Sequence, residues 1–180
     1  VFTAFNASND YKTFVKEAVK KNGEALQFAS ETLQGNNPLV KVAVSNNGMS
    51  LRFATDVLKK TSGVVKIAVN NDGMSLQFAD DSLKGNPEVV MAAVKENGMA
   101  LQFASAELKG YKEVVMEAVK QNGLALQYAS TDLKGVMKLV KEAVKNDGLA
   151  LQFVNKDVFT DPKEYIPLCV NCYLQVNPKK

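Results

Sequence analysis

The chain has 180 residues, of which 46% are hydrophobic and 23% are charged, and its formal net charge is +3. These proportions exclude intrinsic disorder, and no apolar run is long enough to cross a membrane, so we expect a soluble folded protein. The small net charge predicts no general attraction to nucleic acid or membranes. Histidine is absent, which removes the commonest general base and metal ligand and argues against an enzyme.

Residues 1–10 precede the repetitive part of the chain. They contain Phe2 and Phe5, whose rings are suited to cover apolar core at the end of an array, and Asp10, which is suited to cap a following helix. We therefore predict an N-terminal cap over residues 1–10.

The next 150 residues repeat with a period of 25 residues. Every unit has an Ala-Val pair, then Gly, then Leu three residues after the Gly and an aromatic residue two positions further on. Such self-similarity is typical of stacked repeat proteins, whose units bury their apolar faces only against neighbouring units. We predict six tandem units over 11–160, with bounds 11–35, 36–60, 61–85, 86–110, 111–135 and 136–160.

The first half of each unit predicts an α-helix of about three turns. In the fourth unit, residues 88–94 place apolar side chains at i, i+1, i+4 and i+5, which is the spacing of one helix face. Asn36, Ser62 and Asn86 are the predicted N-caps, and proline follows closely in two of these units.

An Asn-Gly or Asp-Gly pair follows each first half. Such pairs often form β-hairpin turns, but the helical pattern before them indicates that the Gly ends a helix in the left-handed conformation. In the fourth unit the following segment has Leu101, Ala104 and Leu108 on one face and predicts a second, shorter α-helix. The predicted fold is an all-α solenoid of six helix-turn-helix repeats with terminal caps.

A leucine-rich horseshoe is the main alternative fold, because 25 residues lies within the period of that class and Leu101 and Phe103 could alternate in a strand. The sequence lacks the longer leucine frame and its asparagine, and the alanine-rich first half is helical in pattern. Helical pairs therefore fit better.

Residues 161–180 depart from the repeat, and we predict a degenerate C-terminal capping half-repeat followed by a polar tail. Cys169 and Cys172 form a C-x-x-C pair in this segment, the spacing of a redox disulfide or half of a zinc site. The chain has no second pair and no histidine, so we expect structural cap residues, with a disulfide or a metal site as alternatives. No cofactor is predicted.

The repeat phrase A-V-x-x-N-G-x-A-L-x-F-A-S-x-x-L is fullest at residues 93–108 and 118–133. It resembles a family of short tandem helical repeats, catalogued as a domain of unknown function, in bacteria including intracellular pathogens, in protists and in giant viruses. The likeness covers all six units, although the sixth departs at Val154 and Asn155. The resemblance implies an α-helical solenoid with an interaction role, by analogy with other solenoids. It leaves the compartment open between the cytoplasm and secretion into a host cell.

Two rows of residues on the second helices form a candidate partner-binding strip. A polar residue follows the repeated Leu, and a mostly apolar residue lies three positions before it on the same helix side. Methionine suits adaptable peptide-binding surfaces, but it also fills gaps in cores, and the polar row could instead form hydrogen bonds between units. The candidate strip consists of Met49, Arg52, Met74, Gln77, Met99, Gln102, Leu124 and Gln127.

Lysines form two further rows, diluted by acidic neighbours such as Glu17. The first-helix row holds Lys16, Lys20, Lys41, Lys66, Lys95, Lys120, Lys141 and Lys145, and the junction row holds Lys59, Lys84, Lys109 and Lys134. Proteins that bind single-stranded nucleic acid need exposed aromatic rings and usually arginine. In this chain we expect the aromatic rings of the repeats to be buried, and Arg52 is the only arginine, so nucleic-acid binding fits less well.

The function predicted from the sequence is a non-catalytic protein- or peptide-binding repeat scaffold whose partner and oligomeric state stay open. Polyanion or nucleic-acid binding through the lysine rows is the alternative.

Overall fold

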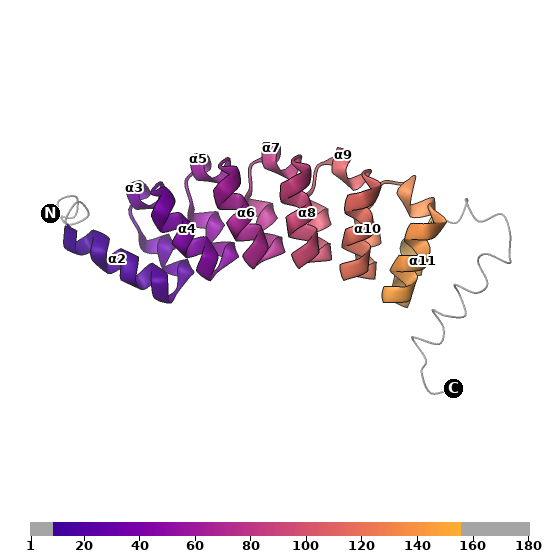
Figure 1. The fold of residues 1–180 in the computed structure, drawn as a ribbon, viewed down its shortest axis with the longest axis horizontal. Helices are drawn as coiled ribbons and strands as arrows, with labels where there is room; N and C mark the ends of the chain where they lie inside the picture. The colour runs from indigo at the N-terminus through magenta and orange to yellow at the C-terminus, as the bar shows by residue number, and fades with distance from the viewer. Residues whose placement is uncertain (1–8, 156–180) are drawn as a thin grey trace, which may run out of the picture.

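The computed structural model describes residues 9–155, and over this range the chain is an elongated array of helices (Figure 1). Every regular element in this range is helical, so the prediction of an all-α solenoid is confirmed. The predicted C-terminal cap, with Cys169 and Cys172, lies outside the described residues, as do residues 1–8 of the predicted N-terminal cap.

Each complete unit contains three helical segments. The long α-helices are α2 (Asn9–Lys21), α4 (Asn37–Asn46), α6 (Ser62–Asn71), α8 (Pro87–Glu96), α10 (Lys112–Gln121) and α11 (Met137–Asn146). Each is followed by a 3₁₀-helix: η1 (Gly23–Phe28), η2 (Gly48–Phe53), η3 (Gly73–Phe78), η4 (Gly98–Phe103), η5 (Gly123–Tyr128) or η7 (Gly148–Phe153). The short segments that close the first five units are α3 (Glu31–Gln34), α5 (Asp56–Lys59), α7 (Asp81–Lys84), α9 (Ala106–Lys109) and the 3₁₀ turn η6 (Leu133–Gly135).

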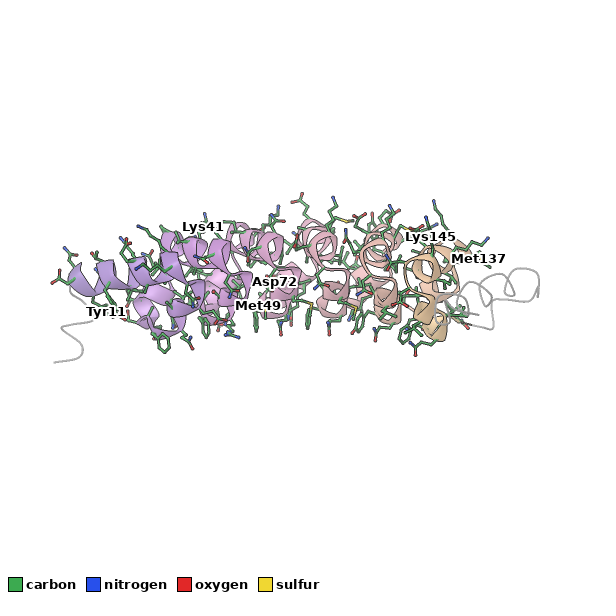
Figure 2. The ribbon with its side chains drawn as sticks, turned by 90° about the horizontal axis from the view of Figure 1, so that it is seen from below. Tyr11, Lys41, Met49, Asp72, Met137 and Lys145 are labelled. Carbon is green, nitrogen blue, oxygen red and sulfur yellow. The ribbon has the colours of Figure 1, made fainter. Side chains whose placement is uncertain are left out.

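The units stack in two layers. Each long helix packs against the next long helix, and each of η1 to η4 packs against the 3₁₀-helix that follows it (Figure 2). The array arches, with α3, α5, α7 and α9 along its convex edge and the C-terminal ends of the long helices along its concave edge (Figure 1). The chain therefore descends through a long helix to the concave edge and returns through a 3₁₀-helix.

Two of the four predicted N-caps are confirmed, and the prediction for Asp10 was wrong, because α2 begins at Asn9 and Asp10 lies in its first turn. Asn36 accepts a hydrogen bond from the Leu39 N–H, and Asn86 caps α8 in the same way. The prediction for Ser62 was wrong, because α6 begins at Ser62 and Thr61 precedes it. The Thr61 hydroxyl donates to the Val57 carbonyl oxygen at 2.9 Å, so this helix has no side-chain cap.

The second half of each unit is not the single α-helix that we predicted. In the fourth unit it consists of η4, an extended break at Ala104 with φ −65° and ψ 154°, and the four-residue α9. The buried residues Gly98, Leu101 and Ala104 recur every three positions, which matches the three residues per turn of a 3₁₀-helix.

The prediction that the repeated glycines adopt the left-handed conformation was also wrong, since no glycine in the described range has a positive φ. The residue before each of them is the N-cap of the 3₁₀-helix, and Asn97, for example, accepts a hydrogen bond from the Met99 N–H at 3.0 Å. Glycine is required because the next unit leaves no room for a side chain. A Cβ at Gly98 would lie 2.3 Å from the carbonyl oxygen of Ala118 in the next unit, and Gly23, Gly48, Gly73 and Gly123 make equivalent contacts.

Hydrogen bonds also join successive units. The Ser105 N–H donates to the Lys84 carbonyl oxygen at 2.9 Å, and this backbone bond recurs at the four equivalent junctions between residues 34 and 155. In the first unit the Tyr11 hydroxyl accepts from the Ser30 N–H at 3.0 Å, the position that a backbone carbonyl fills in later units.

Asparagines at the end of long helices add a side-chain bridge. Asn71 donates through Nδ2 to the Ser45 carbonyl oxygen at 3.0 Å and accepts from the Gly48 N–H at 2.6 Å, so that one amide joins two units at two points. Asn146 makes the same pair of bonds to the fifth unit.

The interior is one continuous apolar core, with two exceptions. Ser50 and Ser75 are fully buried, and their hydroxyl oxygens have no hydrogen-bond partner among the described residues. The other four units have alanine at this position, as at Ala100. Alanine therefore fits the site without an unpaired polar group.

Replacing Gly98 by alanine is expected to lower the free energy of unfolding by about 1–3 kcal/mol, the usual range for overpacking, because the new Cβ would collide with the Ala118 carbonyl oxygen. The matched control is Gly63→Ala in α6, where an added Cβ meets nothing within 4 Å. This control is expected to be neutral or stabilising by up to about 1 kcal/mol. Urea unfolding measures both, and a Gly98→Ala protein as stable as the wild type would contradict the packing argument.

Replacing Asn71 by alanine removes both inter-unit bonds of its amide and is expected to lower the free energy of unfolding by about 1–3 kcal/mol. Gln121 occupies the same position two units later, is exposed, and its side chain has no hydrogen-bond partner in the described range, so Gln121→Ala is the control. Its effect should stay within about 0.5 kcal/mol. Equal losses in the two variants would show that the bridge does not stabilise the stack.

Replacing Ser75 by alanine is expected to raise the free energy of unfolding by about 1 kcal/mol or more, because a buried hydroxyl without a partner keeps its desolvation penalty. The reciprocal variant Ala100→Ser should lower the free energy of unfolding by a similar amount. Denaturant melts of both proteins check this, and a destabilised Ser75→Ala protein would mean that the hydroxyl has a bonded partner in solution.

Candidate binding surfaces

The predicted strip lies on the 3₁₀ layer. In η3 the Gln77 side chain donates through Nε2 to the Met74 carbonyl oxygen at 3.1 Å, and the corresponding bonds occur in η4 and η5. The amide nitrogens of Gln77, Gln102 and Gln127 are therefore used inside their own helices and do not bridge units. Their neighbours in the apolar row, such as Met74 and Met99, are half-buried.

The N-terminal part of the strip has a different character. Arg52 donates to Glu24 Oε1 of the first unit at 3.0 Å, and its guanidinium carbon lies 4.5 Å from the centre of the Phe53 ring. The ion pair thus joins two units, whereas the cation–π contact with Phe53 lies within the second unit. This end of the strip is charged, whereas the part from the third to the fifth unit is apolar and amide-lined.

A row of aromatic rings runs beside the strip. Phe28 is 79% exposed, and the rings at the equivalent position in later units, such as Phe78 and Phe103, are half-buried. The expectation that these rings are buried was wrong. In a helix with three residues per turn Phe103 lies off the buried row that contains Leu101 and Ala104, and it therefore reaches the surface of the 3₁₀ layer.

The lysine row of the first helices lies on the opposite layer. Lys41 and Lys145 point from the long helices on the side away from Met49 (Figure 2). Several lysines of the two rows are paired with carboxylates: Lys20 with Glu17, Lys66 with Glu88, Lys59 with Asp56 and Lys84 with Asp81. These pairs reduce the positive potential that the rows can offer to a polyanion.

Three surface carboxylates have a lowered pKa: Glu17 and Glu88, which are exposed, and Asp80, which is half-buried. A hydrogen bond from Lys20 lowers the pKa of Glu17, and a hydrogen bond from Lys66 lowers that of Glu88. For Asp80 the main cause of the lowered pKa is the hydrogen bond from the Ser82 hydroxyl. All three side chains are therefore ionised at neutral pH.

The structure also reveals a polar groove that the sequence analysis missed. This concave groove, of about 370 Å³, runs along the edge where the long helices meet the 3₁₀-helices. Figure 2 looks onto this edge, with Asp72 near its middle. The groove is lined by Lys21, Asn22, Asn46, Asn47, Asn71, Asp72, Gly73, Glu96 and Asn97.

The signal for this groove was present in the sequence. Every unit has Asn or Asp immediately before its glycine, and we interpreted the pair only as the end of a helix. The structure shows that this residue caps the 3₁₀-helix through Oδ1 and faces the concave edge, as Asn47 and Asn97 do. The repeated Asn or Asp before the glycine therefore forms a row on the concave surface in addition to its place in the turn.

The described residues contain no group of three or more side chains able to hold a metal ion. Within residues 9–155 there is also no helix with the length and apolar character needed to span a membrane. The candidate surfaces are therefore the strip, the lysine rows and the concave groove.

No curated protein and no solved structure matches the chain. A family model described as Domain of unknown function (DUF4116) matches residues 11–59, 63–109 and 111–159. Each match spans about two of the 25-residue units, and together the three matches cover most of the chain. The resemblance to a tandem-repeat family of unknown function is thereby confirmed. The chain belongs to the family described as Domain of unknown function (DUF4116), in three tandem copies that stack into one array.

Proposed function

We propose that the chain is a non-catalytic scaffold that binds a protein or peptide along the surface of its array. The observation that carries this proposal is the way in which the units are joined. Successive units are held by repeated backbone hydrogen bonds and by contacts such as that of Gly98 with Ala118, so the surface rows keep a regular spacing. Solenoids with such regular surfaces commonly bind extended partners.

The strip from Met74 to Gln127 is the surface that we propose for this contact. Its methionines are half-buried and flexible, so they are able to adapt to a partner without leaving the stack. Each Gln side chain is held by a bond to its own helix, as in Gln102, and its carbonyl oxygen makes no bond to the described residues. The strip therefore offers apolar contacts and ordered hydrogen-bond acceptors side by side.

The three carboxylates with a lowered pKa supply fixed negative charges on the surface of the array. The carboxylates with a shifted pKa, Glu17, Asp80 and Glu88, belong to three different units, and each is held ionised by a lysine or serine. A general acid or base requires a pKa near the working pH, and these shifts move away from neutrality.

The double variant Met74→Glu/Met99→Glu is expected to weaken binding at least tenfold for peptides selected against the chain from a displayed random library. Glutamate occupies this row at Glu24, so the change should preserve the fold while it removes the apolar contact. The matched control Met74→Leu/Met99→Leu uses the residue found at Leu124 and should stay within about threefold, less than 1 kcal/mol. Fluorescence anisotropy measures each dissociation constant.

If the glutamate and leucine variants bound the peptides with equal affinity, the strip would not be the surface that contacts the peptide. Retention on heparin that persists at 150 mM salt and is lost when Lys95 and Lys120 are changed to glutamine would instead favour polyanion binding. Both lysines are exposed and have no ion pair among the described residues, which makes them the appropriate positions for this comparison.

A further inference from the structure

The concave groove contains hydrogen-bond donors that the fold does not use. The residue before each repeated glycine caps its 3₁₀-helix with Oδ1, and Asp72 and Asp147 do this with a carboxylate oxygen. The cap therefore needs only an oxygen. Where the residue is asparagine, its Nδ2 group is surplus to the cap, and it has no hydrogen-bond partner within residues 9–155. This holds for Asn22, Asn47, Asn97 and Asn122.

The second asparagine row of the groove is different. Asn46 and Asn71 donate to carbonyl oxygens of the preceding unit, and Asn71 also accepts from the Gly48 N–H. These amides hold the stack together. The groove thus has one row of side chains that fixes the units and, beside it, one row that presents unused N–H groups to solvent.

The spacing of the unused donors suits a peptide main chain. Packed helices lie about 8–10 Å apart, so the capping residues recur at about that interval along the edge, with a donor where the residue is asparagine and an acceptor at Asp72. An extended polyproline-type chain rises about 3.1 Å per residue, and every third carbonyl therefore recurs after about 9 Å. Carbonyl oxygens of one extended peptide are able to meet donors on successive units without a change in the backbone of either molecule.

Negative charge in the groove lies on the third and fourth units, which are the middle units of the six-unit array. Asp72 and Glu96 both line the groove, and neither carboxylate forms an ion pair with a described residue. Lys21 is the basic residue that lines the groove, and it comes from the first unit. A ligand that extends along the groove would therefore place a basic side chain at the third and fourth units.

We propose that the concave groove binds an extended peptide that has a lysine or arginine at its centre. The main-chain carbonyl oxygens of the peptide accept hydrogen bonds from Asn22, Asn47 and Asn97, and its basic side chain pairs with Asp72 and Glu96. This inference rests on the proposed function as a peptide-binding scaffold, but it places the peptide on a different surface from the strip.

The experiment uses the whole chain and a positional-scanning library of ten-residue peptides with blocked ends. The three intervals from the first to the fourth unit add up to about 24–30 Å, which about nine residues of a polyproline-type chain cover. Fluorescence anisotropy at 150 mM salt compares pools with arginine, alanine or glutamate at each position. Arginine pools at the central positions are expected to bind at least tenfold more tightly than the glutamate pools.

The variant Asn47→Asp/Asn97→Asp separates the two parts of the proposal. Aspartate preserves the cap, as Asp72 and Asp147 show, but it replaces each amide donor by an acceptor. If the amides hold the main chain, affinity for the central-arginine pool falls at least tenfold. If only charge attracts the peptide, two added carboxylates raise the affinity instead, and that result would overturn the proposal.

Asp72→Asn is the complementary variant, because it keeps the cap, removes the charge and adds a donor. This variant should bind the central-arginine pool at least fivefold more weakly than the wild type. Its affinity for the central-alanine pool should be unchanged or higher. Should the double aspartate variant fail to fold, as judged by circular dichroism, Asn47→Ser/Asn97→Ser keeps a capping oxygen and removes both amides. The serine variant is then expected to show the same tenfold loss.

The outcomes also distinguish this inference from the broader function. Binding that is lost in Met74→Glu/Met99→Glu but kept in the groove variants would assign the peptide to the strip and overturn the groove. Binding lost in the groove variants and kept within threefold in the strip variant supports the groove. A library in which no pool binds with a dissociation constant below 1 mM would overturn the groove, whereas binding by the strip is tested separately with the peptides selected from the displayed library.

Discussion

The contact between the glycine of one unit and the alanine carbonyl of the next determines how closely the units stack. At Gly98 any side chain would meet the Ala118 oxygen at 2.3 Å, and the same contact recurs along the array. Alanine on the facing helix completes the close approach because its side chain is small and fully buried. The alignment of the layers, the inter-unit hydrogen bonds and the regular surface rows all depend on this distance.

The same constraint explains the unusual second half of the unit. After the glycine the chain must bury Leu101 and Ala104 on the side that faces the stack, and three residues per turn is the helical period that aligns Gly98 with both. A 3₁₀-helix needs a cap at its start, which Asn97 supplies with Oδ1. The cap turns the rest of that side chain toward the concave edge, so a packing requirement creates a polar surface row.

Much of this arrangement follows from the sequence. The tandem repeat and the long helices were predicted because apolar spacing is a local pattern. The prediction of a second α-helix was wrong because we looked for a period of 3.6 residues. Gly98, Leu101 and Ala104 instead recur every three residues. The role of Gly98 could not be predicted locally, since the atom that excludes a side chain belongs to another unit. The residues of the predicted strip lie on the 3₁₀ layer, and its role as a binding site stays a prediction. The concave groove was missed because its asparagines were interpreted only as turn residues.

The six units differ in sequence mainly at positions that the stacking contact does not constrain. Every unit keeps glycine as the first residue of its 3₁₀-helix and an alanine in its long helix. The two residues before the glycine differ between units: Lys21-Asn22, Asn46-Asn47, Asn71-Asp72, Glu96-Asn97, Gln121-Asn122 and Asn146-Asp147. A change from asparagine to aspartate in the second of these positions keeps the capping oxygen and alters only the charge and the donor that face the groove. The repeat can therefore change what its concave edge recognises, one unit at a time, without a change in the spacing that holds the array together.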